Sequence, residues 1–266
     1  MSESPAAYLE GIGRAGDGPH DIARAALMLA ALDHPGQPLE PSLAHLHEIA
    51  ETMAAQRPMI LRIADGAQAL SATLAGRFGY DGDRGTYNDP ANADLMAVIA
   101  RRRGLPVALG ILYMHAARAA GLRASGLNTA GHFLVRIVHR HDDLTIDPFH
   151  GGMVLEPGHI PAALDDAQLA QPVGDTDVLL RLQNNLKLRA LEDGEEERAL
   201  ELTGRMVLFA PHRAELWFDL GRLNEAVGVL GASRKAYETC LALSPPGQAL
   251  HNEAALSLAQ LKRRLN

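Results

Sequence analysis

The feature that most constrains the fold of this chain is a change in the spacing of its apolar residues. Over the first 120 residues, rich in Ala and Leu, apolar positions recur with the period of an amphipathic helix. From Leu122 to Phe149 the period becomes two, which is typical of β-strands, and from about Asp175 it is helical again. This order predicts an α+β domain over residues 1–170, followed by an all-α domain over 175–266.

The helical period predicts six helices before the strands. Asp89 can cap the free backbone N–H groups of the fifth helix, Pro90 suits its first turn, and Gly104 ends it. The sixth helix opens at Pro106, is rich in small residues and is expected at the centre of the domain. The expected ranges are 4–14, 20–32, 41–56, 58–78, 91–103 and 107–120.

The segments 132–139 and 143–149 have the alternation of a β-hairpin, with a preceding strand over 122–129. If the turn lies around His139 and Arg140, residues whose numbers sum to 279 face each other, and His132 faces Asp147. Directly opposed Cβ atoms are about 4.5–5.5 Å apart, so the imidazole can hydrogen-bond the carboxylate. The hairpin therefore predicts a His132–Asp147 dyad, although a slip of one residue would separate the two faces.

An aspartate that orients a histidine forms part of a nucleophilic site, which also needs a serine or cysteine. The order of one helix and two strands resembles the transglutaminase-like cysteine hydrolases, with a cysteine at the helix start, His on the first strand and Asp on the next. In that pattern about fifteen residues separate the cysteine from the glycine that ends its helix. Counting back from Gly121 reaches Pro106, so proline occupies the nucleophile's position.

Proline supplies neither a thiol nor a backbone N–H, which the resemblance requires for the nucleophile and for an oxyanion donor. Cys240 is the single cysteine of the chain and lies in the C-terminal helical region. It therefore does not replace the missing thiol, and its expected role is to pack between helices.

The C-terminal region contains a repeat with the spacing of tetratricopeptide units. The segment from Trp217 to Pro245 follows the pattern W-x2-L-G, then an aromatic residue, then Pro, and Pro211 lies 34 residues before Pro245. Two repeats and a capping helix over 248–264 are expected. The residues that fit are Leu186, Ala199, Pro211, Trp217, Leu220, Gly221, Ala236, Tyr237, Cys240 and Pro245.

Together these features resemble the bacterial SirB-type transglutaminase-like proteins with tetratricopeptide repeats, over about residues 40–260. The matching stretches are GLPVALGILY, GHFLVR and IDPFHGG, with Asn88 and Asn92. Because the nucleophile is absent, we expect a non-catalytic protein whose repeats dock a protein partner and whose vestigial cleft binds a peptide-like or small ligand, without a cofactor. The residues expected to line the cleft are Asn88, Asn92, Pro106, Tyr113 and Phe149, and the two asparagines have capping and turn formation as their alternative role.

Three other interpretations of the His132–Asp147 pair stay open. The pair can simply pin the hairpin as a structural hydrogen bond. It can belong to an active hydrolase or acyltransferase in which His132 activates water or a hydroxyl, and the candidate hydroxyls are Ser125, Thr129 and Tyr113. It can also contribute to a metal site, but no recognised zinc spacing occurs and none is expected. The residues considered for a metal are His132, His139, His141, His150, His159, Asp142, Asp143 and Asp147.

Charge and hydropathy argue against nucleic acid and membrane partners. The formal net charge of -7 repels phosphate backbones, and the clusters Arg101–Arg103 and Lys262–Arg264 fall where helices end. The longest apolar run, Leu105–Met114, is far shorter than the roughly 20 residues of a membrane span. The first residues lack the basic and apolar segments of a secretion signal, so a cytoplasmic protein is expected, consistent with a single cysteine.

Overall fold

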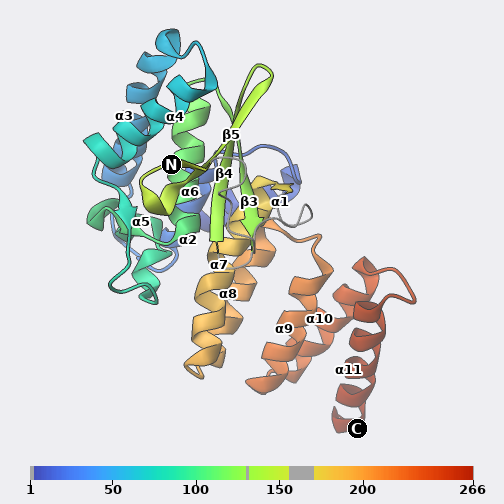
Figure 1. The fold of residues 1–266 in the computed structure, drawn as a ribbon. Helices are drawn as coiled ribbons and strands as arrows, with labels where there is room; N and C mark the ends of the chain where they lie inside the picture. The colour runs from blue at the N-terminus through green and yellow to red at the C-terminus, as the bar shows by residue number, and fades with distance from the viewer. Residues whose placement is uncertain (1–2, 130–131, 156–170, 266) are drawn as a thin grey trace. The chain divides into compact units, whose positions relative to one another are not determined.

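The computed structural model describes residues 3–129, 132–155 and 171–265 of the chain (Figure 1). These residues form two compact units, one over Asp17–Leu182 and one that combines Met1–Gly16 with Gln183–Asn266. The first unit mixes helices with a sheet, and the second is built from helices. The predicted fold class, α+β followed by an all-α region, is confirmed.

The first helix departs from the expected division of the chain. Helix α1 (Pro5–Ala15) packs on α8 (Glu196–Phe209) and so belongs to the C-terminal unit, whereas the sequence assigned it to the N-terminal domain. Gly13 allows the close approach, because a Cβ atom there would lie 2.4 Å from the carbonyl oxygen of Leu208.

Helix α6 (Pro106–Ala119) lies at the centre of the mixed unit, as the sequence predicts. Almost every residue from Val107 to Ala117 is buried, and the helix packs against strands β3 and β4 and helix α3 (Figure 1). Gly110 contacts the ring of Phe133, which leaves no space for a side chain at that position. The other helices of this unit are α2 (Ile22–Ala31), α3 (Glu40–Gln56), α4 (Ile63–Ser71) and α5 (Leu95–Arg101), with the short turns η1 (Arg57–Met59), η2 (Ala72–Arg77), η3 (Pro90–Asn92) and η4 (Pro148–His150).

Two of the expected helices are broken by local capping. The range 58–78 divides into η1, α4 and η2, and Asp65 caps α4 by accepting from the backbone N–H of Arg62 at 2.8 Å. The range 91–103 divides into η3 and α5, where Asp89 caps only η3 and Asp94 caps α5. Helix α5 ends at Arg102, which adopts a left-handed φ of 58°, and not at Gly104.

Within the described residues, five antiparallel strands form one sheet in the order β6-β5-β4-β3-β7. A small parallel pair, β1 and β2, joins the loop after η2 to the end of α5. The sequence missed β1, β2, β6 and β7, because two or three residues are too few to show a period. The strands are β1 (Asp81–Gly82), β2 (Arg103–Gly104), β3 (Arg123–Thr129), β4 (His132–His139), β5 (Asp142–Asp147), β6 (Met153–Leu155) and β7 (Pro172–Val173).

The C-terminal unit contains the expected helical hairpins. Gly221 lies against the ring of Tyr237, and the indole N–H of Trp217 donates to the carbonyl of Pro211 at 2.8 Å, so the repeat positions have packing roles. Cys240 is fully buried among them. None of the described helices combines the length and the apolar composition of a membrane span. The helices of this unit are α1, the part of α7 (Asp175–Glu192) from Gln183 onward, α8, α9 (Ala214–Ala226), α10 (Leu230–Leu243) and α11 (Ala249–Leu265).

Candidate functional site

The hairpin of β4 and β5 does not place His132 directly opposite Asp147. Its paired residues run from Val135 with Ile146 to His139 with Asp142, so their numbers sum to 281 and not to the predicted 279. The turn lies one residue later than expected, and Arg140 adopts a left-handed φ of 56° there. One pair beyond Val135 and Ile146, the same register sets Asp147 opposite Leu134. His132 is then the diagonal neighbour of Asp147 on the same face of the sheet.

Asp147 instead holds His150. One carboxylate oxygen of Asp147 accepts the backbone N–H of Phe149 at 2.9 Å, and the other lies 2.7 Å from Nδ1 of His150. The reason is local, since η4 is a 3₁₀ turn and residues three apart along such a turn are eclipsed. The side chain of Asp147 is 11% exposed and that of His150 is 45% exposed, so the pair reaches from the interior to the surface.

Tyr113 lies beneath this pair in the core. Its side chain is fully buried, and a Cβ atom on Gly152 would lie 2.9 Å from its hydroxyl oxygen. Burial raises the pKa of Tyr113, and the negative charges of Asp81 and Asp147 raise it further. Among the described residues the hydroxyl has no hydrogen-bond partner. Tyr113 therefore stays protonated and is covered by protein, so it is not an exposed nucleophile.

Phe149 is the central residue of an aromatic cluster in the mixed unit. Its ring makes edge contacts with Tyr87 at 5.9 Å and with His150 at 5.5 Å between centroids. The guanidinium of Arg84 lies 5.3 Å from the centre of the Phe149 ring and pairs with Asp81 at 2.9 Å. Gly82 makes room for the ring, because a Cβ atom there would lie 2.5 Å from it.

The two predicted asparagines lie in or next to the loop that carries Tyr87. Asn88 is exposed, and Asn92 is buried, with its amide donating to the carbonyl of Thr86 at 2.6 Å. The carboxylate of Asp83 organises this loop by accepting from the hydroxyl and backbone N–H of Thr86, and these bonds lower its pKa to about 2. Asn92 thus shapes the loop, which is the capping role considered for it.

Pro106 is the first residue of α6, where the sequence predicts that the helix opens. The residue before it, Leu105, donates its backbone N–H to the carbonyl of Asn92 at 2.8 Å, which ties the helix start to the asparagine loop. Cys240 belongs to the other compact unit, and burial raises the pKa of its thiol. Pro106, Asn92, the Tyr87 loop, Phe149 and Asp147 are therefore connected by successive contacts within one unit.

The other hydroxyl candidates lie on β3. Thr129 is the register partner of His132, and Ser125 pairs with Arg136 further along the strand. The carbonyl of His132 accepts from the guanidinium of Arg181 at 3.0 Å, which fixes the start of β4 against α7.

The described part of the chain contains no group of three His, Cys, Asp or Glu side chains that could hold a metal ion. His139 pairs with Asp142 across the hairpin turn, and His150 is engaged by Asp147. His159, another residue considered for a metal, lies outside the described residues.

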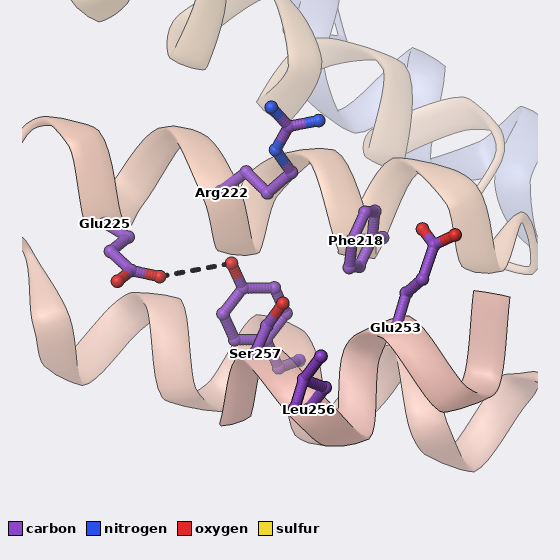
Figure 2. Close-up of a pocket in the computed structure, with 7 residues that line it drawn as sticks. Phe218, Arg222, Glu225, Glu253, Leu256 and Ser257 are labelled. Carbon is purple, nitrogen blue, oxygen red and sulfur yellow. Dashed lines mark hydrogen bonds between the residues drawn. The ribbon is translucent and has the colours of Figure 1, made fainter. Parts of the chain in front are cut away.

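The C-terminal unit contains a groove that the sequence did not predict. It has a volume of about 430 Å³ and is lined by residues of α9 and α11 (Figure 2) and by Tyr237 of α10. Tyr237 donates its hydroxyl to Glu225 at 3.3 Å, and Leu256 is 61% exposed at the groove's edge. The aromatic positions of the repeat pattern could have indicated its floor. The lining residues are Phe218, Arg222, Glu225, Tyr237, Glu253, Leu256 and Ser257.

These observations define a class of protein, an α+β domain followed by helical repeats. The chain belongs to the transglutaminase-like superfamily, whose family pattern matches residues 40–184. Residues 186–266 match the tetratricopeptide repeat family. The predicted resemblance is confirmed.

The curated relatives include UPF0162 proteins of bacteria and an F-box protein of the mouse. A UPF0162 protein of Xylella fastidiosa (strain 9a5c) is 29% identical over 66% of this chain and 67% of its own length. A UPF0162 protein of Xylella fastidiosa (strain Temecula1) is 31% identical over 58% of this chain and 59% of its own length. F-box only protein 21 of Mus musculus is 30% identical over 36% of this chain and 16% of its own length. No solved structure matches the chain significantly.

His150, Tyr87 and Arg84 are the site residues that sequence reasoning did not assign to the cleft. His150 had a signal, since it follows Asp147 by three residues in IDPFHGG and the intervening Pro148 favours a tight turn. Tyr87 and Arg84 had none, because the loop that brings them to Phe149 has no periodicity.

Proposed function

We propose that this protein is a non-catalytic binding module, a regulatory or scaffold protein built on a hydrolase fold. Its transglutaminase-like domain binds a peptide-like or small ligand, and its repeats dock a protein partner. The observation that carries the proposal is Pro106 at the first position of α6, where the family pattern has its cysteine.

Two physical properties of Pro106 support the loss of catalysis. A cysteine nucleophile at a helix start reacts as its thiolate, and its backbone N–H commonly donates a hydrogen bond to the oxyanion. Proline has neither a thiol nor a backbone N–H. The single cysteine cannot compensate, because Cys240 is fully buried in the other unit and burial keeps its thiol protonated.

The ligand surface that fits the proposal is the aromatic cluster of Tyr87 and Phe149 with His150 beside it. Exposed aromatic rings next to a few polar groups are the usual composition of a binding site. For the partner, the groove between α9 and α11 offers exposed apolar surface with charged residues at its edges (Figure 2).

Covalent probes test the absence of a nucleophile. The full chain with its native Cys240 is treated under native conditions with a fluorophosphonate, which labels activated hydroxyls, and with an iodoacetamide probe, which labels thiols. We expect no labelling by either reagent. Pro106→Cys in the same background is the positive control for the thiol probe, because residue 106 is partly exposed. Fluorophosphonate labelling that disappears in His132→Ala would overturn the proposal.

One observation favours the alternative, a hydrolase or acyltransferase in which a His132–Asp147 dyad serves a nucleophile other than cysteine. Thr129 is the direct register partner of His132, so a hydroxyl residue and an imidazole residue share one pair of the sheet. This alternative expects fluorophosphonate labelling that is lost in both Thr129→Val and His132→Ala.

A further inference from the structure

His150 is the imidazole that lies at hydrogen-bond distance from Asp147, with 2.7 Å between Nδ1 and the carboxylate. Asp147 is buried and His150 is 45% exposed, so the carboxylate orients a ring that solvent and ligands can reach. We propose that His150, positioned by Asp147, is the residue through which this site hydrogen-bonds its ligand. The inference rests on the proposed binding function and adds to it the recognition chemistry.

The contacts of Asp147 determine which nitrogen of His150 carries the proton. An ionised carboxylate can only accept hydrogen bonds, and its other oxygen already accepts the backbone N–H of Phe149 at 2.9 Å. Nδ1 of His150 therefore bears the hydrogen, and in the neutral ring Nε2 keeps its lone pair. With the ring neutral, the site presents a hydrogen-bond acceptor at Nε2, to which a ligand supplies a donor.

The backbone around His150 is held in place from both sides. The hydroxyl of Ser71 donates to the carbonyl of Gly151 at 2.7 Å, and the N–H of Gly152 donates to the carbonyl of Asp147 at 2.9 Å. Gly151 and Gly152 have left-handed φ angles of 65° and 78°, which glycine adopts without strain. The imidazole is therefore preorganised, and a ligand does not have to order it.

The neighbours of His150 define the class of ligand. Phe149 and Tyr87 provide aromatic surface, and Tyr87 is 42% exposed. The positive charge of Arg84 is compensated by Asp81 at 2.9 Å, so this surface does not select for an anion. A neutral donor next to an apolar group fits both features. The ligand class is thus a peptide-like molecule that donates an amide N–H or a hydroxyl to Nε2 and packs an apolar side chain on the rings.

The tautomer of His150 is the first measurement. Long-range ¹H–¹⁵N correlation spectra of the full chain near neutral pH should show the proton of the neutral His150 ring on Nδ1. Asp147→Asn should reverse this, because the amide NH₂ can donate to Nδ1 and moves the ring proton to Nε2, while its oxygen still accepts from Phe149. A wild-type spectrum with the proton on Nε2 would overturn the inference.

Binding is the second measurement, with the blocked peptide acetyl-Ala-Phe-Ala-amide at millimolar concentration as the probe, followed by chemical-shift changes. His150→Ala, which removes the acceptor, and Asp147→Asn, which moves the ring proton to Nε2, should each weaken binding about five- to tenfold, the effect of one lost hydrogen bond. His47→Ala is the matched control, because His47 is also an exposed histidine and its ion pair is with Glu51 of the same helix.

The two measurements separate the inference from the proposed function. Peptide binding that is unchanged in His150→Ala would refute the role of His150 and leave a binding protein. If the peptide does not bind at these concentrations, the ligand class assigned here is wrong, and the tautomer still decides whether Asp147 orients His150. Fluorophosphonate labelling of the wild-type chain would instead remove the proposed function.

Discussion

At the scale of single residues, His45 shows how a buried contact makes stability depend on pH. Its side chain is 10% exposed, and Nε2 lies 2.6 Å from a guanidinium nitrogen of Arg102 and 2.9 Å from the hydroxyl of Tyr80. Burial lowers the pKa of His45, and the positive charge of Arg102 lowers it further, while Glu48 opposes them. The folded protein therefore prefers the neutral imidazole, which accepts a hydrogen bond from Arg102.

We predict that replacing His45 flattens the pH dependence of folding stability. Because the folded pKa lies below the ordinary value of 6.5, the unfolded chain binds the proton more readily, and stability falls as pH decreases through 6.5. His45→Gln keeps an acceptor for Arg102 but does not titrate, so it should lose less stability between neutral and mildly acidic pH. Urea unfolding at several pH values measures this.

His47→Gln provides the control for this prediction. His47 lies on the same helix, but its side chain is 72% exposed and its ion pair with Glu51 is at the surface. The pH profile of His47→Gln should therefore retain the wild-type decline. A His45→Gln profile parallel to that of wild type would show that His45 does not control the decline.

At the scale of elements, the sequence predicted the helix and the strands of the site correctly but not the register in which the two strands pair. The strands over 132–139 and 143–149 and the helix from Pro106 follow from periodicity and helix-start signals, and all three are present. The register was wrong by two residues, because it depends on a turn in which Arg140 adopts a left-handed φ, a conformation that glycine or asparagine would have signalled. As a result, the residue opposite Asp147 in this register is Leu134 and not His132.

The sequence predicted that α6 is buried, but not which side chains it packs against. Phe133 is 1% exposed and lies between Gly110 of α6 and Gly126 of β3, where added Cβ atoms would lie 2.4 Å and 2.6 Å from its ring. A periodic pattern identifies such glycines as small residues in a helix or strand, but it cannot identify the aromatic ring that requires them.

We predict that Gly110→Ala destabilises the mixed unit by about 1–3 kcal/mol, because overpacking against Phe133 exceeds the gain in helix propensity of up to about 1 kcal/mol. Hydrogen exchange measured by mass spectrometry should show faster exchange in peptides from α6 and β4. Gly204→Ala in α8 is the control, since no atom lies within 4 Å of the added Cβ, and it should slow exchange or leave it unchanged. Equal behaviour of the two variants would contradict the packing argument.

At the scale of the whole molecule, the first helix of the chain belongs to the same compact unit as the last helices. Residues 1–16 form one compact unit with residues 183–266, although the sequence assigned them to the first domain. Amphipathic spacing predicts that α1 buries one face, but it does not say which helix covers that face. The partner is set by a close approach at Gly13, which lies against Leu208 and Pro211.

Two glycines of α1 test whether this helix supports the C-terminal unit. A Cβ atom at Gly13 would lie 2.4 Å from the carbonyl oxygen of Leu208, and backbone cannot yield as a flexible side chain does. Gly13→Ala should therefore destabilise the unit by about 1–3 kcal/mol and speed exchange in both α1 and α8. Gly11→Ala has only the end of the Arg14 side chain nearby, at 3.9 Å, and should stabilise α1 by up to about 1 kcal/mol. If Gly13→Ala slows exchange as Gly11→Ala does, α1 does not pack tightly on α8, and the grouping of the two ends of the chain loses its physical basis.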